Sequence, residues 1–358
     1  MKDIDQLVDD SIELLKDLIA IPSLSGQEAG SAERIAAYFE REGIPYKRKG
    51  HNIWAVNRYR DKGKPLLLLN SHHDTVKPNS GWTFDPFRPT EKDGKLIGLG
   101  SNDAGAPLVS LMAVFTHFYD KKDLPFSIIM AATAEEETSG QNGIRSVLNE
   151  FGKIDLAVVG EPTGMQMAVA EKGLIVLRCR ARGQSGHAAR NTGENAIYKA
   201  LRDIEWFKSY RFPKESACLG PVKMSVTMIK AGTQHNVVPD ACEFTVDVRT
   251  TDTYSNEEIL RIIKANIQSD IDRVSLSLRP SSIDQDHPLV RAARFMGIAI
   301  FGSPTLSDQA LIDAPSVKIG PGRSERSHTA DEFVYVDEIV EGVQGYIKLL
   351  ERFFNTIE

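Results

Sequence analysis

Apolar residues recur every three or four positions in several stretches of the chain, a spacing that predicts amphipathic helices. The first stretch covers residues 4–19 and stops before Pro22, and the last covers residues 337–353. A shorter apolar stripe lies within residues 32–39, and residues 108–118 are apolar almost throughout. We expect helices here that pack their apolar faces on a core.

Short, mostly apolar runs between these stretches predict buried strands. They cover residues 53–56, 66–69, 127–132, 156–160 and 316–320. Three of the runs lead within a few residues to His72 and Asp74, to Glu135–Glu137 and to Glu161. Side chains two apart on a strand face the same way, so His72 and Asp74 should project together while His73 points elsewhere. A histidine backed by a carboxylate is typical of a zinc site, although a histidine at a strand end is commonly only hydrogen-bonded.

The turn before the helix predicted over residues 108–118 also carries a carboxylate. Asp103 stands between Gly100 and Gly105, glycines that predict a tight turn with close backbone approach. Its side chain either caps the following helix or bridges two cations. The sequence leaves both interpretations open.

The acidic triplet Glu135–Glu137 and His328 complete the candidate chemistry. Three consecutive carboxylates usually form a solvated loop, but at the end of a central strand they need a counter-charge, which a metal supplies. His328 lies on a glycine-rich loop after the run over residues 316–320 and is the best remaining nitrogen ligand. Strand ends with His, Asp, Glu-Glu and Glu therefore predict a metal site.

At 358 residues the chain exceeds the usual size of a single core, so we expect two domains. A separate pattern of strands and helices fills residues 173–282, which predicts an α+β unit. Its strands are expected over residues 174–181, 223–228 and 243–249, and its helices over residues 196–206 and 256–267. The predicted division is a catalytic domain formed by residues 1–172 and 283–358, with residues 173–282 inserted.

The composition excludes several kinds of partner. A net charge of -6 and a pI near 5.8 argue against binding to nucleic acid or an anionic membrane. No apolar run approaches the roughly 20 residues that span a bilayer, so we expect a cytoplasmic protein. Cys179, Cys218 and Cys242 lack CxxC spacing and are interpreted as unpaired thiols.

Seven motifs together resemble the zinc-dependent family of acetylornithine deacetylase, succinyl-diaminopimelate desuccinylase, aminoacylase and glutamate carboxypeptidase. They occur in that family's order and cover essentially the whole chain. They are residues 71–74 (Ser-His-His-Asp), 100–103 (Gly-Ser-Asn-Asp), 135–137 (Glu-Glu-Glu), 160–163 (Gly-Glu-Pro-Thr), 185–188 (Ser-Gly-His-Ala), 236–240 (Asn-Val-Val-Pro-Asp) and 320–328 (Gly-Pro-Gly through His328). The resemblance implies an α/β fold, with a mixed-sheet, di-zinc exopeptidase-like catalytic domain and an inserted α+β lid and dimerisation domain.

The resemblance also implies a set of metal ligands. One Zn²⁺ would be held by His72, Asp103 and Glu161, and a second by Asp103, Glu137 and His328, with Co²⁺ or Mn²⁺ as possible substitutes. Three protein ligands per ion leave a position open for catalysis.

Two further residues receive catalytic roles from the same resemblance. Asp74 would orient His72, and Glu136 would be the general base that deprotonates the water shared by the metals. The family often has Asp-Glu-Glu where this chain has three glutamates, so Glu136 and Glu137 are matched to the paired glutamates. The family's Met-Lys-Gly after the bridging aspartate is replaced by residues 104–106 (Ala-Gly-Ala), which affects the expected substrate contacts.

For the lid, the resemblance implies that His187 and Asn236 reach an active site and stabilise the oxyanion, from the same subunit or from a partner. Arg249 is the candidate for gripping a substrate carboxylate. From the residues alone, His187 is interpreted as a surface histidine, and Arg249 is equally a member of a surface ion pair. Arg323 and Arg326 suggest room for a second carboxylate, as in a succinyl group. The lid further implies a homodimer.

The predicted function is that of a di-zinc amidohydrolase that removes an acetyl or succinyl group from an amino acid such as ornithine or citrulline. The overall likeness to the acetylornithine and acetylcitrulline deacetylases favours a role in arginine biosynthesis, with a small N-acyl amino acid as substrate. A di-zinc dipeptidase or carboxypeptidase is the alternative, because the metal site is the same. A metal-binding relative without turnover is a third hypothesis, which the presence of Glu136 disfavours.

Overall fold

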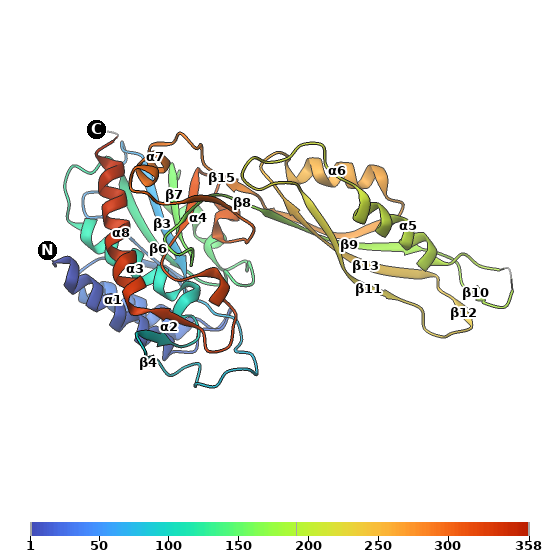
Figure 1. Ribbon diagram of the computed structural model, residues 1–358, viewed down its shortest axis with the longest axis horizontal. Coiled ribbons are helices and arrows are strands. Elements are labelled where there is room, and N and C mark those ends of the chain that lie inside the picture. The colour runs from blue at the N-terminus through green and yellow to red at the C-terminus, as the bar shows by residue number, and fades with distance from the viewer. Residues whose placement is uncertain (1, 191, 357–358) are drawn as a thin grey trace. The chain divides into compact units, whose positions relative to one another are not determined.

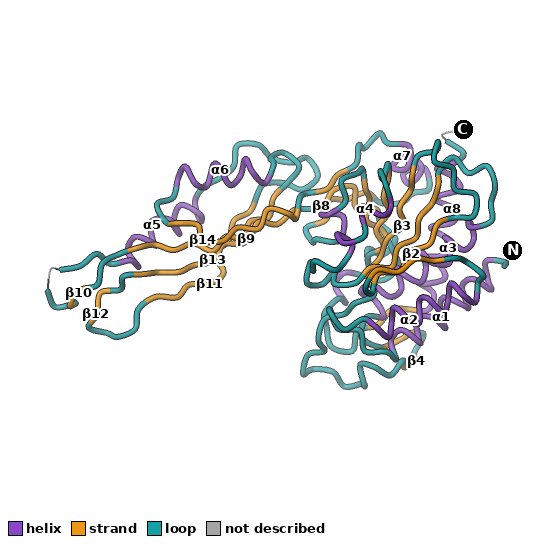
Figure 2. The backbone as a smooth tube through the Cα atoms, turned by 180° about the vertical axis from the view of Figure 1, so that it is seen from behind, coloured by secondary structure: helices purple, strands orange, loops and turns teal. Residues whose placement is uncertain are grey.

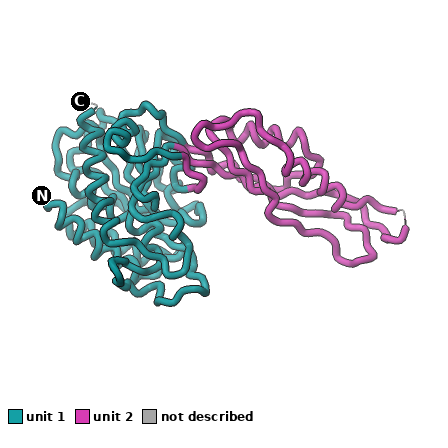
Figure 3. Tube along the Cα trace, viewed as in Figure 1, with its two compact units in different colours: residues 1–169, 282–301, 307–358 teal, residues 170–281, 302–306 magenta. Residues whose placement is uncertain are grey.

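The computed structural model describes residues 2–190 and 192–356 (Figure 1). The chain forms two compact units, coloured separately in Figure 3. Unit 1 contains the residues up to 169, residues 282–301 and the residues from 307 on, and unit 2 contains residues 170–281 and 302–306. These limits lie within a few residues of the predicted division. The exception is residues 302–306.

Assigning residues 302–306 to the catalytic domain was wrong. The backbone here packs on unit 2, because a Cβ atom on Gly302 would lie 2.1 Å from the carbonyl oxygen of Cys218. The N–H of Lys172 donates to the carbonyl of Ser303 at 3.1 Å. Backbone contacts of this kind leave no signal in a hydrophobic pattern.

Unit 1 is built on a nine-stranded mixed sheet. Its order is β1-β2-β6-β3-β7-β17-β8-β15, with β16 also paired to β8. The strands are β1 (Tyr46–Lys49), β2 (Asn52–Val56), β3 (Leu66–His72), β6 (Ser127–Thr133), β7 (Leu156–Gly160), β8 (Met167–Glu171), β15 (Ser281–Ser282), β16 (Ile300–Ser303) and β17 (Ser316–Ile319). The central strands β6, β3, β7 and β17 are parallel, while β2 and β8 join them antiparallel. Parallel neighbours bring their carboxyl ends to one edge of the sheet.

Helices cover this sheet, which explains why β3 and β6 are buried at every position. Figure 2 shows α1, α3 and α8 side by side against the strands, and the three helices pack on one another. Unit 1 contains α1 (Ile4–Ile19), α2 (Ala29–Arg41), α3 (Ala106–Tyr119), α4 (Leu148–Phe151), α7 (Pro288–Phe295) and α8 (Val336–Phe354). These bounds confirm the helices predicted at both ends of the chain. No helix among the described residues is long and apolar enough to cross a membrane.

A small three-stranded sheet in unit 1 was not predicted. It joins β4 (Thr90–Lys92), β5 (Lys95–Ile97) and β18 (Phe333–Tyr335) in the order β18-β5-β4. The pairing of β18 with β5 places the end of the His328 loop beside the start of the Asp103 turn.

Unit 2 is a four-stranded antiparallel sheet with two helices on one face, and three of its strands and both helices were predicted from the pattern. The order is β11-β13-β9-β14. The elements are β9 (Gly173–Arg182), β11 (Lys223–Ala231), β13 (Ala241–Thr250), β14 (Asp270–Leu278), α5 (Ala196–Ser209) and α6 (Asn256–Asn266), with the short strands β10 (Gly186–His187) and β12 (Val237–Val238) paired to each other. Burial alternates along β9, as expected when one face carries the core and the other faces solvent. The edge strand β14 was missed because most of its residues are exposed and it has no apolar run.

Candidate metal centre

The carboxyl ends of the central parallel strands carry most of the candidate residues. His72 is the last residue of β3 and lies opposite Thr133, the last residue of β6. Glu136 and Glu137 follow β6, and Glu161 follows β7 directly. His73 points the other way, and its ring nitrogens contact the Ser31 hydroxyl at 2.8 Å and the His51 carbonyl at 3.0 Å. The prediction that His73 points away from the side of the strand to which His72 projects is therefore confirmed.

The first group of side chains surrounds the Nε2 atom of His72. This nitrogen lies 3.4 Å from Oδ1 of Asp103 and 3.8 Å from Oε1 of Glu161. Oε2 of Glu136 lies 3.9 Å from the same nitrogen. The other ring nitrogen, Nδ1, contacts the backbone carbonyl of Asp74 at 3.0 Å, so Nε2 is the atom that faces the cluster.

The second group surrounds the Nε2 atom of His328. This nitrogen lies 3.0 Å from Oε2 of Glu137 and 3.6 Å from Oδ2 of Asp103. The two oxygens of Asp103 thus face different imidazoles. A carboxylate in this position is able to serve both groups, as the resemblance implied.

Asp103 does not cap the helix that follows. The residue before α3 is Gly105, and no side chain caps the helix there. Asp103 instead lies in the turn Ser101–Gly105, and its peptide bond to Ala104 is cis. Of the two interpretations left open by the sequence, capping is wrong.

Asp74 organises the loop that carries the glutamates. Its Oδ1 accepts the N–H of Glu136 at 3.0 Å, and its Oδ2 accepts the N–H of Glu137 at 3.2 Å and the Ser25 hydroxyl at 2.6 Å. Burial alone would raise the pKa of Asp74, but the neighbouring His72 and these donors lower it to about 2. The side chain is therefore a fixed negative charge behind the His72 ring.

Glu135 takes no part in the cluster. Its carboxylate accepts hydrogen bonds from the backbone N–H and the side-chain amide of Asn142 at 2.9 and 2.8 Å. Its own N–H donates to Glu28, which is fully buried. Of the three glutamates, Glu136 and Glu137 face the histidines, and these are the two that the resemblance matched to the family's paired glutamates.

Electrostatic coupling within the cluster is strong. Burial disfavours the imidazolium of His72, but the carboxylates of Asp103 and Asp74 outweigh it and raise its pKa well above the ordinary value. The hydrogen bond to Glu137 raises the pKa of His328 to about 9. Burial, with help from nearby carboxylates, raises the pKa of Glu136 well above its ordinary value. Such a concentration of acids and imidazoles is typical of a functional site.

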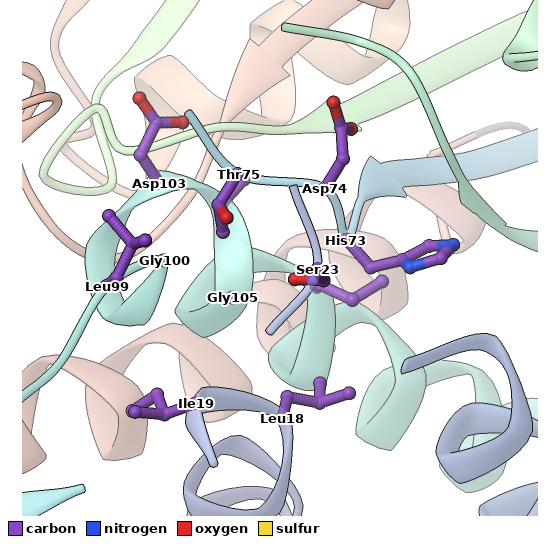
Figure 4. A pocket seen from close by; sticks show the side chains of 12 residues that line it. Leu18, Ile19, Ser23, His73, Asp74, Thr75, Leu99, Gly100, Asp103 and Gly105 are labelled. Carbon is purple, nitrogen blue, oxygen red and sulfur yellow. The ribbon is translucent and has the colours of Figure 1, made fainter. Parts of the chain in front are cut away.

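The donor set fits divalent cations. The ligand atoms of His72, Asp103 and Glu137 all lie within 4.8 Å of one another, and Glu161 and His328 border them. Imidazole nitrogens mixed with carboxylate oxygens suit zinc and also cobalt or manganese. A small cavity of about 20 Å³, large enough for one water, is lined in part by Asp74 and Asp103. Figure 4 shows Asp74 and Asp103 extending to one side of it, with Leu18 and Ile19 of α1 opposite.

The candidate residues of unit 2 fall into two separate places. His187 and Asn236 are neighbours, because the N–H of Ala188 donates to the Asn236 carbonyl at 3.0 Å and β10 pairs with β12. They lie beyond the end of the sheet where Arg182 faces Ala241. Arg249 lies at the other end of β13, opposite Leu174. It is roughly 25 Å from Ala241, at about 3.3 Å per strand residue.

The three candidate arginines differ in their ion pairs and in their exposure to solvent. Two hydrogen bonds at 2.9 and 3.1 Å join the Arg249 guanidinium to Asp247, which is the surface ion pair that the sequence allowed. Arg326 makes two such bonds to Glu338 and stacks on aromatic rings, and its suggested contact with a substrate carboxylate stays a prediction. Arg323 keeps 66% of its side chain exposed.

Glu332 is a buried residue at the site that the sequence interpretation missed. Its Oε1 atom accepts the N–H groups of Asn102 and Asp103, both at 2.9 Å. Burial and the Asp103 carboxylate raise its pKa to about 8. A lone glutamate before an apolar strand resembles any surface residue, so the only available signal was its place four residues after His328.

Comparison with known proteins gives relatives along the whole chain. The sequence profile of peptidase family M20/M25/M40 matches residues 68–352. The acetylornithine deacetylase of Proteus mirabilis (strain HI4320) is 28% identical over 96% of this chain and 96% of that protein. The succinyl-diaminopimelate desuccinylase of Wolbachia pipientis wMel is 26% identical over 97% of this chain and 94% of that protein.

Solved structures share the fold at lower identity. Aminopeptidase PepT from Bacillus cereus ATCC 10987 superposes with a TM-score of 0.77 and 20% identity, covering 98% of this chain and 99% of that one. The YXEP protein of Bacillus subtilis, described as a dinuclear metal binding peptidase, has a TM-score of 0.74 and 16% identity, covering 98% and 99%. The mixed-sheet fold with an inserted α+β unit is therefore shared with these proteins.

Proposed function

Because the chain belongs to peptidase family M20/M25/M40 and is a metal-dependent amidohydrolase, we propose that it removes an N-acyl group from an amino acid. The membership confirms the resemblance drawn from the seven motifs. One observation carries the proposal beyond the family. The carboxylate of Glu136 faces the first group of ligands, with its Oε2 atom 3.9 Å from Nε2 of His72, while its backbone N–H donates to Asp74.

We assign the metal ligands as the resemblance implied. His72, Asp103 and Glu161 would hold one divalent ion, and Asp103, Glu137 and His328 a second. When bound, such ions supply Lewis acidity toward the amide carbonyl and toward water. Zinc is the expected metal.

Side chains of the protein carry out the proton transfers. Glu136 accepts a proton from the water that attacks the amide carbonyl, and it returns that proton to the nitrogen of the leaving amine. Asp74 keeps His72 in one orientation and holds the peptide of Glu136 in place. His187 and Asn236 are proposed donors to the negative oxygen that develops in the transition state.

For the substrate we propose an amino acid that carries an N-acetyl or N-succinyl group, such as ornithine or citrulline. The named activities of the two curated relatives support this class. The exposed Arg323, near the His328 loop, offers a cation for a substrate carboxylate. Arginine biosynthesis remains the proposed setting, and the substrate role of Arg249 remains a prediction.

We propose a homodimer formed through unit 2. Large apolar side chains are exposed on α5 and on β11, an edge strand of the four-stranded sheet. They are Tyr198, Leu201, Met228 and Ile229. Exposed apolar residues gathered beside a free strand edge support an interface at this surface.

A substrate screen tests the proposed function. The metal-loaded protein should hydrolyse N-acetyl or N-succinyl derivatives of ornithine, citrulline or diaminopimelate, and a Glu136→Gln preparation made in parallel should not. Cleavage of dipeptides with inactivity on every N-acyl amino acid would favour the dipeptidase or carboxypeptidase alternative. Metal binding without turnover of either class would favour a non-enzymatic relative.

A further inference from the structure

Glu332 is a buried carboxylate that no ion pair explains. It is 2% exposed, and no lysine or arginine among residues 2–190 and 192–356 pairs with it. Its Oε1 atom instead accepts two consecutive backbone N–H groups, those of Asn102 and Asp103. Burying a carboxylate is costly unless hydrogen bonds compensate. The two backbone N–H groups supply this compensation, and the side chain in turn holds their peptide groups in place.

The contacted backbone is the turn that presents Asp103. A second link joins the same two segments, because the Asn102 side chain accepts the N–H of Arg323 at 2.8 Å and donates to the Arg323 carbonyl at 3.0 Å. The N–H of Gly98 also donates to the carbonyl of Glu332 at 3.0 Å. The turn is thus hydrogen-bonded to the His328 loop at two places, to Arg323 before His328 and to Glu332 after it.

We propose that Glu332 is a positioning residue, which fixes Asp103 between the two groups of metal ligands and in register with His328. This inference rests on the proposed metal assignment. Asp103 faces His72 with one oxygen and His328 with the other, so a small rotation of its backbone would move both contacts. Partners that orient ligands in this way typically contribute about 10- to 100-fold in metal affinity.

Two conservative substitutions separate the position of the acceptor oxygen from its charge. Glu332→Gln removes the charge but keeps an oxygen at the same reach, and a carbonyl oxygen accepts two N–H groups. Glu332→Asp keeps the charge but withdraws the oxygens by one methylene. Each metal-free variant is titrated with Zn²⁺ in competition with a chromophoric chelator, and kcat and KM are measured at limiting and saturating Zn²⁺.

We expect Glu332→Gln to bind Zn²⁺ within about threefold of the wild-type protein, and Glu332→Asp to bind about 10- to 100-fold more weakly. Excess Zn²⁺ should recover part of the kcat of Glu332→Asp without a change in KM, which a loss of general stability would not produce. The opposite order, with Gln weak and Asp unchanged, would overturn the proposal in favour of a role for charge. Equal affinity in all three proteins would also overturn it.

Asp203 in unit 2 provides a matched control. It is 4% exposed and likewise accepts backbone N–H groups, from Gln268 and Ser269. Asp203→Glu alters the reach by one methylene, and it should lower the melting temperature without changing Zn²⁺ affinity. An equal loss of affinity in this control would overturn the positioning role. Failure of the wild-type protein to bind Zn²⁺ would instead contradict the proposed function itself.

Discussion

Three consecutive glutamates have three different surroundings at the end of β6. The Glu135 carboxylate accepts hydrogen bonds from Asn142, and Glu137 contacts His328. Glu136 faces His72, and its N–H donates to Asp74. Residues of one type thus acquire different partners within three consecutive positions. Their roles are separable by substitution.

Glu136→Gln should retain two metals while turnover falls by several orders of magnitude, because the proton acceptor is lost and the ligands remain. Glu137→Gln should instead lose the second metal. Metal content is measured by elemental analysis beside kcat. The reverse result, with metal lost from Glu136→Gln, would show that the ligand and the base are exchanged.

Metal binding should release protons. The raised pKa values of His72 and His328 mean that both rings are protonated in the metal-free protein at neutral pH. A cation binds only the deprotonated nitrogen, so Zn²⁺ should displace about one proton from each ring. The apparent affinity should therefore rise with pH from neutral pH up to at least the pKa of His328, about 9.

Proton release is measured in a weakly buffered solution with a pH indicator as Zn²⁺ is added. His187→Ala, which changes a histidine outside the cluster, should release the same number of protons as the wild-type protein. Binding without proton release at pH 7 would contradict the placement of the histidines in the metal centre.

At the scale of elements, the Asp103 turn depends on close backbone packing. A Cβ atom on Gly105 would lie 2.3 Å from the carbonyl oxygen of Gly100 and 2.6 Å from Leu15 of α1. Gly105→Ala should therefore displace the turn, lower the free energy of unfolding by about 1–3 kcal/mol and weaken metal binding. Thermal melting and Zn²⁺ titration test this expectation.

Gly345→Ala is the matched control. Gly345 lies within α8, and a Cβ atom there would meet only the flexible end of the Met165 side chain. It should keep full metal affinity. Normal metal binding by Gly105→Ala would show that the turn adapts without moving Asp103.

The strands that carry ligands were predictable because they are apolar throughout and their ends are abruptly charged, as at His72 and Glu161. The turn at Asp103 was only partly predictable. Its glycines indicated close packing, but the choice between helix cap and bridging ligand depends on which atoms lie across the turn. The strands β4, β5 and β18 were missed because each is three residues long and partly polar.

At the scale of the whole molecule, the insertion of unit 2 was predictable, because a separate pattern of strands and helices lies before the last proposed metal ligand, His328. The transfer of residues 302–306 to unit 2 was not visible, since it rests on the backbone of Gly302. Motif order supplied the family. The substrate was not predictable in the same way, because the contacts that hold the proposed substrate-binding arginines, such as that of Arg249 with Asp247, leave no signal in the sequence pattern.

The proposed dimer allows a test of whether His187 acts on the partner's site. Inactive Glu136→Ala and His187→Ala homodimers are mixed and allowed to exchange subunits. If His187 acts in trans, one site of each heterodimer combines Glu136 of one chain with His187 of the other and should regain normal turnover. Loss of such a donor typically costs about a hundred- to a thousand-fold in kcat, so recovery is easily measured.

Heterodimer formation is confirmed independently with two affinity tags. If His187 serves its own subunit, each site keeps one defect and mixing restores nothing. Absent recovery would leave His187 either acting in cis or as a surface histidine.

Anomalous diffraction from a zinc-loaded crystal tests the central claim most directly. Two peaks roughly 3.5 Å apart are expected, as in other two-metal hydrolases. His72, Asp103 and Glu161 should contact one peak, and Asp103, Glu137 and His328 the other. A single peak, or zinc bound away from these five side chains, would contradict the account.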